Sequence, residues 1–203
     1  MSKKEHWDKI YSTKTLQEVS WYQPVPKISL ELILSLKLSK DSPIIDVGGG
    51  DSFLVDSLIE KGYLDLTVLD ISKVAIERAK KRLGKHAKKV NWIVSDITNF
   101  YPERKYSVWH DRAVFHFLRN EQEINSYLKS LNDGTDDNGK LVIGTFAENG
   151  PLRCCALGVM RYSFNDLENT FSNYFQINKM INSIHQTPFN TYQSFNFVQA
   201  IKK

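Results

Sequence analysis

The chain has 203 residues, of which 41% are hydrophobic and 25% are charged, and its formal net charge is +4. This composition excludes a disordered or fibrous protein, and the length suits a single α/β domain with a buried core. The N-terminus lacks the apolar run of a signal peptide, and no stretch approaches membrane-spanning length. We therefore expect a cytoplasmic protein, monomer or homodimer, that acts away from membranes. The only cysteines are the adjacent Cys154 and Cys155, which predict no disulfide with each other and no metal site.

The first 40 residues predict an N-terminal helical cap. A short helix is expected at 3–12, and a second helix carries the apolar positions Ile28, Leu32, Ile33 and Leu36. The segment 20–26 between them contains two prolines, which exclude a regular helix.

Residues 41–145 alternate between apolar runs and amphipathic stretches, which indicates a cofactor-binding core of βαβ units. Strands are predicted at 43–47, 65–69, 90–94, 106–110 and 140–145, and helices at 51–61, 72–84 and 120–131. Residues 146–203 predict a substrate loop, a helix near 164–172 and two strands at 174–184 and 194–202, joined by a turn. The expected fold is a Rossmann-like, seven-stranded, mostly parallel sheet with helices on both faces and an antiparallel C-terminal hairpin.

Arg78–Lys89 holds seven basic residues. A phosphate-tracking surface would explain them, but Val74, Ala75, Ala79 and Leu83 supply an apolar stripe for one helix. We therefore interpret the run as the solvated side of an amphipathic helix and expect no nucleic-acid partner.

Three predicted strands each lead to a carboxylate, and the first runs into a glycine turn. Asp46 is followed by Gly48, Gly49 and Gly50, Asp70 follows the second strand, and Asp96 the third. Because parallel strands present their carboxyl ends at one edge, these acids should converge where such sheets bind ligands. Asp70 could accept hydrogen bonds from ribose hydroxyls and Asp96 from an adenine amino group, with Ile97 against the ring. Each acid could instead cap the following helix.

A dinucleotide is the less favoured cofactor. Its fingerprint needs a glycine where this chain has Phe53. Asp46 before the turn and Asp51, predicted to open the next helix, would also repel a pyrophosphate. The zwitterionic tail of a sulfonium cofactor meets no such objection.

The motif Asp46-Val47-Gly48-Gly49-Gly50-Asp51-Ser52 resembles the first motif of class I S-adenosylmethionine-dependent methyltransferases, with Ser52 in place of the last glycine. A bacterial methyltransferase group resembles the chain almost end to end, at His6-Trp7-Asp8, Trp109–Leu118 and Gly144–Pro151. The opening is similar, more loosely, to eukaryotic protein-lysine methyltransferases. In the bacterial group the segment after Gly-Pro tends to read Cys-Ser-Gly-Leu, from which Cys154-Cys155-Ala156-Leu157 departs.

The resemblance implies S-adenosylmethionine as cofactor and no metal. It places Gly48 and Gly50 beside the methionine part, Asp70 with Ile71 at the ribose, and Asp96 with Ile97 at the adenine. Tyr11 would reach the cofactor's carboxylate, and Trp21 would either cover the pocket or anchor the cap.

Candidate substrate-contacting residues follow the fourth strand. His110 could act as a base or line the methionine part through its backbone, and Arg112 could hold an anionic substrate. His116 lies four residues farther, on the same helical face if this segment is helical. The alternative is structural, with Asp111 as a helix cap paired with Arg112 and with His116 in the core.

The leading hypothesis is a methyltransferase that acts on a small molecule or a protein side chain. A non-catalytic S-adenosylmethionine sensor or regulatory subunit is one alternative. A nicotinamide-dependent oxidoreductase is the other, disfavoured by Phe53 and Asp46.

Overall fold

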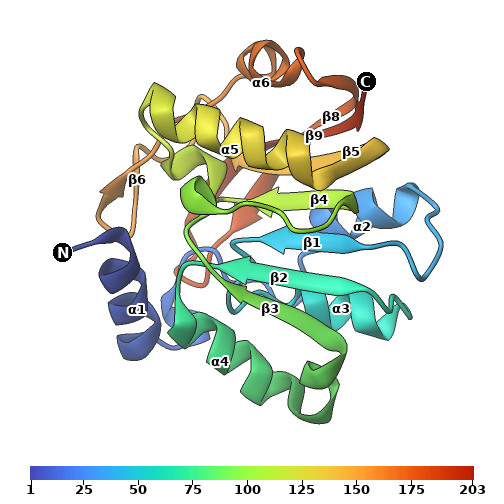
Figure 1. The fold of residues 1–203 in the computed structure, drawn as a ribbon. Helices are drawn as coiled ribbons and strands as arrows, with labels where there is room; N and C mark the ends of the chain where they lie inside the picture. The colour runs from blue at the N-terminus through green and yellow to red at the C-terminus, as the bar shows by residue number, and fades with distance from the viewer.

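A seven-stranded sheet with the strand order β3-β2-β1-β4-β5-β9-β8 forms the centre of the computed structural model, which describes residues 1–203 (Figure 1). β1 to β5 are parallel, while β9 runs antiparallel to both β5 and β8. The strands are β1 Ile44–Val47, β2 Leu66–Asp70, β3 Val90–Val94, β4 Tyr106–Arg112, β5 Thr135–Phe146, β8 Phe175–Gln186 and β9 Tyr192–Lys202. The predicted fold class, including the C-terminal hairpin, is confirmed.

Two hydrophobic clusters lie on opposite faces of the sheet, because neighbouring residues of a strand point to opposite sides. Val108 belongs to the cluster under α2 (Lys27–Ser35) and α3 (Leu54–Glu60). Trp109, the next residue, belongs to the cluster under α5 (Glu121–Gly134) and α6 (Phe164–Phe171). Strands buried on both faces explain the nearly continuous apolar runs of the sequence. The remaining helices are α1 Lys3–Thr13, α4 Lys73–Leu83 and the short η1 Leu16–Glu18, η2 Gly84–Lys89, η3 Ile97–Asn99 and η4 Phe115–Phe117.

Helix α1 buries none of its residues completely and makes polar contacts with α4. Its start is fixed by a capping box, in which Ser2 and Glu5 exchange hydrogen bonds. From α4, Arg78 donates to the carbonyl oxygens of Tyr11 at 2.8 Å and Lys14 at 2.7 Å. In Figure 1, α1 and the strand β6 (Arg153–Cys154) lie at the end of the sheet toward which β1 and β4 point. Two segments distant in sequence thus border the edge where parallel sheets bind ligands.

Residues 51–53 lie outside α3, so the prediction that Asp51 opens this helix is wrong. The helix begins at Leu54 with Phe53 at its N-cap. Asp51 is instead buried and forms ion pairs with Arg82 and, at 2.9 Å, with Arg78. The two arginines neutralise Asp51, and Arg82 also donates to the carbonyl oxygen of Ser52 at 2.7 Å. Two members of the basic run thus brace the glycine turn instead of facing solvent.

Strands β6 and β7 (Leu157–Gly158) form an antiparallel hairpin with a two-residue turn, in the segment predicted as the substrate loop. Its central residues, Cys155 and Ala156, have φ of 48° and 65°. Turns of this kind favour glycine or asparagine, since a Cβ atom is strained at positive φ. Ala156 occupies the place where the resembling bacterial group carries glycine. The replacement of glycine by alanine therefore strains the backbone at this turn.

Candidate active site

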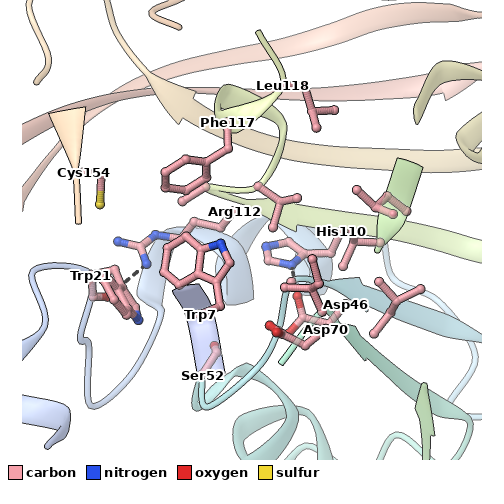
Figure 2. Close-up of a pocket in the computed structure, with 18 of the residues that line it drawn as sticks. Trp7, Trp21, Asp46, Ser52, Asp70, His110, Arg112, Phe117, Leu118 and Cys154 are labelled. Atoms are coloured by element: carbon pink, nitrogen blue, oxygen red, sulfur yellow. Dashed lines mark hydrogen bonds and ion pairs between the residues drawn. The ribbon is translucent and has the colours of Figure 1, made fainter. Parts of the chain in front are cut away.

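A cavity opens at the carboxyl ends of β1, β2 and β4 and encloses about 1150 Å³, including its mouth (Figure 2). Strand order reverses between β1 and β4, which is where open α/β sheets bind ligands. Most of the predicted site residues lie on its wall, namely Tyr11, Trp21, Asp46, Gly48, Gly49, Asp70, Ile71, Asp96, Ile97, His110 and Arg112. Gly50 and His116 are not part of the wall.

The glycine turn keeps the backbone close to the cavity floor. Gly48 and Gly50 have φ of 66° and 42°, which glycine adopts without strain. A Cβ atom on Gly50 would lie 2.6 Å from Oδ2 of Asp70 and 3.1 Å from the hydroxyl of Tyr11. Although Gly50 does not line the cavity, its missing side chain leaves the space in which two wall residues stand.

Asp70 ends β2 with a buried carboxyl group that has one protein donor. Its Oδ1 accepts the backbone N–H of Ser72 at 2.7 Å. Burial raises the pKa of Asp70 to about 7, and the charges of Asp46, Asp8 and Asp51 act in the same direction. The helix α4 is capped by Ser72, so the alternative in which Asp70 itself caps the helix is not what the structure shows. The Oδ2 atom is free to accept hydroxyl donors from a ligand.

Asp96 caps the short helix η3, as one of its two predicted roles requires, and it also lines the cavity. Its Oδ1 accepts from the backbone N–H of Thr98 at 2.9 Å and from the Thr98 hydroxyl at 2.8 Å, which caps η3. One carboxylate oxygen therefore fixes the turn, while the residue still lines the cavity beside the buried Ile97. A planar ring could pack on Ile97 and donate to the second oxygen.

His110 is held between two polar side chains, with Asp46 on one side and Ser29 on the other. Its Nδ1 lies 2.6 Å from Oδ1 of Asp46, and its Nε2 lies 2.8 Å from the hydroxyl of Ser29. The Asp46 carboxylate favours the tautomer with the proton on Nδ1, so Nε2 accepts from Ser29. The second oxygen of Asp46, Oδ2, is buried and has no partner. A cationic or N–H donor of a ligand would satisfy it.

Arg112, the last residue of β4, carries a guanidinium group without a carboxylate partner. Its one hydrogen bond is from Nη1 to the carbonyl oxygen of Trp21 at 3.1 Å. The guanidinium also lies over the ring of Phe195, 4.9 Å from its centroid. Burial lowers the pKa of Arg112 to about 10, although Asp46 and Cys154 oppose the shift. The group therefore stays charged at neutral pH.

The prediction that Arg112 and His116 share a helical face is wrong, because Arg112 belongs to β4 and His116 to η4. Asp111 accepts the backbone N–H groups of Val114 at 2.9 Å and Phe115 at 3.1 Å, so it caps this short turn as the structural alternative proposes. It does not pair with Arg112.

His116 is fully buried and stacks on the ring of Phe146 at 4.3 Å. Its Nδ1 accepts the backbone N–H of Phe146, while its Nε2 has no partner. Burial lowers the pKa of His116 to about 3, and the charge of Arg112 adds to this effect. The imidazole therefore lies in the core, outside the cavity wall, and is neutral at neutral pH.

Aromatic side chains from distant segments close the cavity, and the sequence reasoning assigned most of them no role. Trp7 of α1 lies edge-on to Phe117 at 5.2 Å and to Trp21 at 5.8 Å (Figure 2). Phe195 enters from the C-terminal hairpin, and Cys154 from the β6–β7 turn. Trp7 belongs to a motif of the resembling group and could have been selected, whereas nothing in the local sequence marks Phe195.

The wall is suited to a nucleoside cofactor with an amino-acid tail. The free oxygens of Asp70 and Asp96 face one end, and the unpartnered Oδ2 of Asp46 fits an ammonium group. No group of three or more histidine, cysteine, aspartate or glutamate residues is placed to hold a metal ion. None of the helices has the length and apolarity needed to cross a membrane.

Comparisons with known proteins agree with this geometry. Residues 45–141 match the family model described as "Methyltransferase domain". Malonyl-[acyl-carrier protein] O-methyltransferase 1 of Ilyobacter polytropus is 32% identical over 110 residues, which cover 53% of this chain and 39% of that protein. The mouse eEF1A lysine and N-terminal methyltransferase is 25% identical over 122 residues, 59% of this chain and 17% of that protein. The chain thus spans well under half the length of these relatives.

Solved structures show the same fold over nearly the whole chain. A methyltransferase from Anabaena variabilis superposes with a TM-score of 0.73 at 15% identity, covering 98% of this chain and 93% of that one. The N-methyltransferase NodS of Bradyrhizobium japonicum gives a TM-score of 0.70 at 15% identity, covering 98% and 97%. These likenesses confirm the fold predicted from the sequence.

Proposed function

We propose that this chain transfers a methyl group from S-adenosylmethionine to a small molecule, because residues 45–141 match a methyltransferase domain model and the fold is one that solved methyltransferases share. The observation that carries the proposal is the convergence of Asp46, Asp70 and Asp96 on one cavity beside a glycine turn. Each of these carboxylates keeps an oxygen that no other protein group binds.

The cofactor would lie along the carboxyl ends of β1 to β3. Asp70 would accept both ribose hydroxyls beside Ile71, and Asp96 the adenine amino group, with Ile97 against the ring. Gly48, Gly49 and Gly50 would leave room for the methionine part, and the orphaned oxygen of Asp46 would bind its ammonium group. Tyr11 and Trp21, contributed by the cap, would cover the methionine end.

When bound, S-adenosylmethionine supplies a sulfonium-activated methyl group for an in-line displacement. The protein's main task is then to align the acceptor with that group and to exclude water. The aromatic side chains Trp7, Trp21 and Phe117 provide the exclusion. Where the acceptor must lose a proton, His110 is the base that the wall offers, since its Nδ1 faces the carboxylate of Asp46 and its Nε2 faces only the hydroxyl of Ser29.

Arg112 would contact the acceptor, as predicted. His116, the third predicted catalytic candidate, would act instead as a positioning residue, because its ring is stacked on Phe146 behind the wall. An enclosed, aromatic-walled cavity favours a small acceptor over an extended protein surface.

Calorimetry with S-adenosylmethionine, S-adenosylhomocysteine and NAD tests the cofactor assignment. We expect both sulfur compounds to bind and NAD to fail, and binding of NAD alone would refute the proposal. Turnover is tested with methyl-labelled cofactor and fractionated cell extract, where label should enter the small-molecule fraction. Label in proteins only would refute the small acceptor, and binding without labelling in either fraction would favour a sensor.

A further inference from the structure

Arg112 is the one lysine or arginine of the cavity wall that forms no ion pair, since Lys3 pairs with Glu123. Three carboxylates line the same wall, but none lies within ion-pair distance of Arg112, and its single hydrogen bond goes to a carbonyl oxygen. Because a guanidinium has five N–H donors, most of its capacity remains unused at the cavity surface. Arg112 is half-buried, and a partly desolvated charge without an ionic partner is unfavourable, which indicates that a ligand completes it.

The neighbouring cysteine does not supply the missing charge. Cys154 lies close enough to influence Arg112, but its hydrogen bond with Cys155 and its burial raise the pKa of the Cys154 thiol. It therefore stays neutral. His185 is neutral too, since burial and the charge of Arg112 both lower the pKa of that imidazole. Besides the carbonyl oxygen of Trp21 and the more distant charge of Asp46, the protein offers the guanidinium only the face of Phe195.

The surroundings of the guanidinium define the rest of the ligand. Phe195 lies under it, Trp21 beside it, and Trp7 with Phe117 farther along the wall. Flat aromatic walls favour a flat apolar body, and a guanidinium fork favours a carboxylate or similar planar anion. The same positive charge would repel an ammonium group such as that of a lysine side chain.

Resting on the function proposed above, we propose that the methyl acceptor is a carboxylate-bearing molecule with a flat apolar body, and that Arg112 binds its carboxylate inside the cavity. The other possible source of a carboxylate is the methionine tail of the cofactor. The orphaned oxygen of Asp46 and the hydroxyl of Tyr11 at the glycine turn already offer that tail polar partners. Arg112 stands apart from them, toward Phe195.

The test uses the full chain saturated with S-adenosylhomocysteine and titrated with matched acids and amides. Suitable pairs are benzoate with benzamide, phenylacetate with phenylacetamide and 2-naphthoate with 2-naphthamide. We expect the acid to bind at least about tenfold more tightly in at least one pair, as a charge-assisted bidentate contact requires. Arg112→Met should abolish the preference and Arg112→Lys should retain part of it. Arg161→Met, which changes an exposed arginine in the loop between β7 and α6, should leave it unchanged.

Three outcomes overturn the inference. One is the absence of any acid preference in every pair of the unmodified protein, including the case in which no probe binds. Another is a preference that survives in Arg112→Met. The last is a loss of S-adenosylhomocysteine affinity in Arg112→Met as large as the loss of acid affinity, which would assign the guanidinium to the cofactor tail. Failure of the unmodified protein to bind S-adenosylhomocysteine would instead refute the proposed function itself.

Discussion

Replacement of Asp70 with asparagine should stabilise the ligand-free fold while weakening cofactor binding. The carboxyl group is buried, has one donor in Ser72 and has a pKa raised to about 7. Relative to an ordinary aspartate, its ionised form is destabilised by up to about 4 kcal/mol, at 1.36 kcal/mol per tenfold change in proton affinity. Asparagine keeps an oxygen for the Ser72 N–H and carries no charge. We therefore expect a gain of about 1–4 kcal/mol in the free energy of unfolding at about pH 8.

The pH dependence of this gain follows from the direction of the pKa shift. A carboxyl group whose pKa is higher in the folded than in the unfolded state binds its proton more tightly when folded. Its unfavourable effect is therefore absent below about pH 4 and grows as the pH rises through about 7. The difference between variant and unmodified protein should shrink toward zero at about pH 4. Thermal unfolding followed by circular dichroism at both pH values measures it, with about 2–4 °C expected per kcal/mol for a chain of this size.

Cofactor affinity should change in the opposite direction. Loss of charge-assisted hydrogen bonds to the ribose costs about 1.5–3 kcal/mol, or roughly tenfold or more in the dissociation constant of S-adenosylhomocysteine. In the unmodified protein this affinity should fall as the pH drops below about 7, since the ionised Asp70 is the better acceptor. Asp41→Asn, an exposed aspartate outside the cavity, is the matched control. Unchanged affinity in Asp70→Asn, or a lower melting temperature at about pH 8, would refute the reasoning.

Three further changes test the glycine turn, the strained hairpin and the histidine. Gly50→Ala should weaken S-adenosylhomocysteine binding in calorimetry, since its Cβ would meet Asp70 at 2.6 Å, whereas Gly62→Ala, also at positive φ but with open space around it, should lower stability only. Ala156→Gly should raise the melting temperature, because relief of about 1–2 kcal/mol of strain at a φ of 65° exceeds the added chain entropy of about 0.4–1 kcal/mol. His110→Gln should reduce the turnover number about 100-fold or more if a base is needed, with cofactor affinity retained.

These expectations would be contradicted by specific results. Equal affinities of the two glycine variants would show that the space at Gly50 is not used by the cofactor. A lower melting temperature of Ala156→Gly would mean that the hairpin strain is offset by contacts of the alanine methyl group. A parallel loss of cofactor affinity and turnover in His110→Gln would assign His110 to cofactor binding.

The sheet could be predicted from the sequence because its strands are marked locally. Apolar runs such as Ile44–Val47, separated by amphipathic stretches of helical length, leave few arrangements other than a parallel sheet. The ends of strands and helices were predicted less well where side chains from distant parts of the sequence determine them. The strand β4 continues to Arg112, two residues beyond its predicted end, and α3 starts three residues late because Arg78 and Arg82 hold Asp51 outside the helix.

The cofactor end of the cavity could be predicted from the sequence better than the acceptor end, for the same reason. Asp70 and Asp96 make their hydrogen bonds to residues two positions away, so a short motif encodes both the turn and the ligand contact. Arg112, in contrast, receives its environment from Trp21 in the cap and Phe195 in the C-terminal hairpin, each more than 80 residues distant. Contacts between residues so far apart produce no recognisable pattern in the sequence of the cap or of the hairpin. The acceptor end can therefore change through substitutions in the cap and the hairpin while the cofactor frame stays intact. This separation agrees with the finding that two relatives with different acceptors in their names align with only 53% and 59% of this chain.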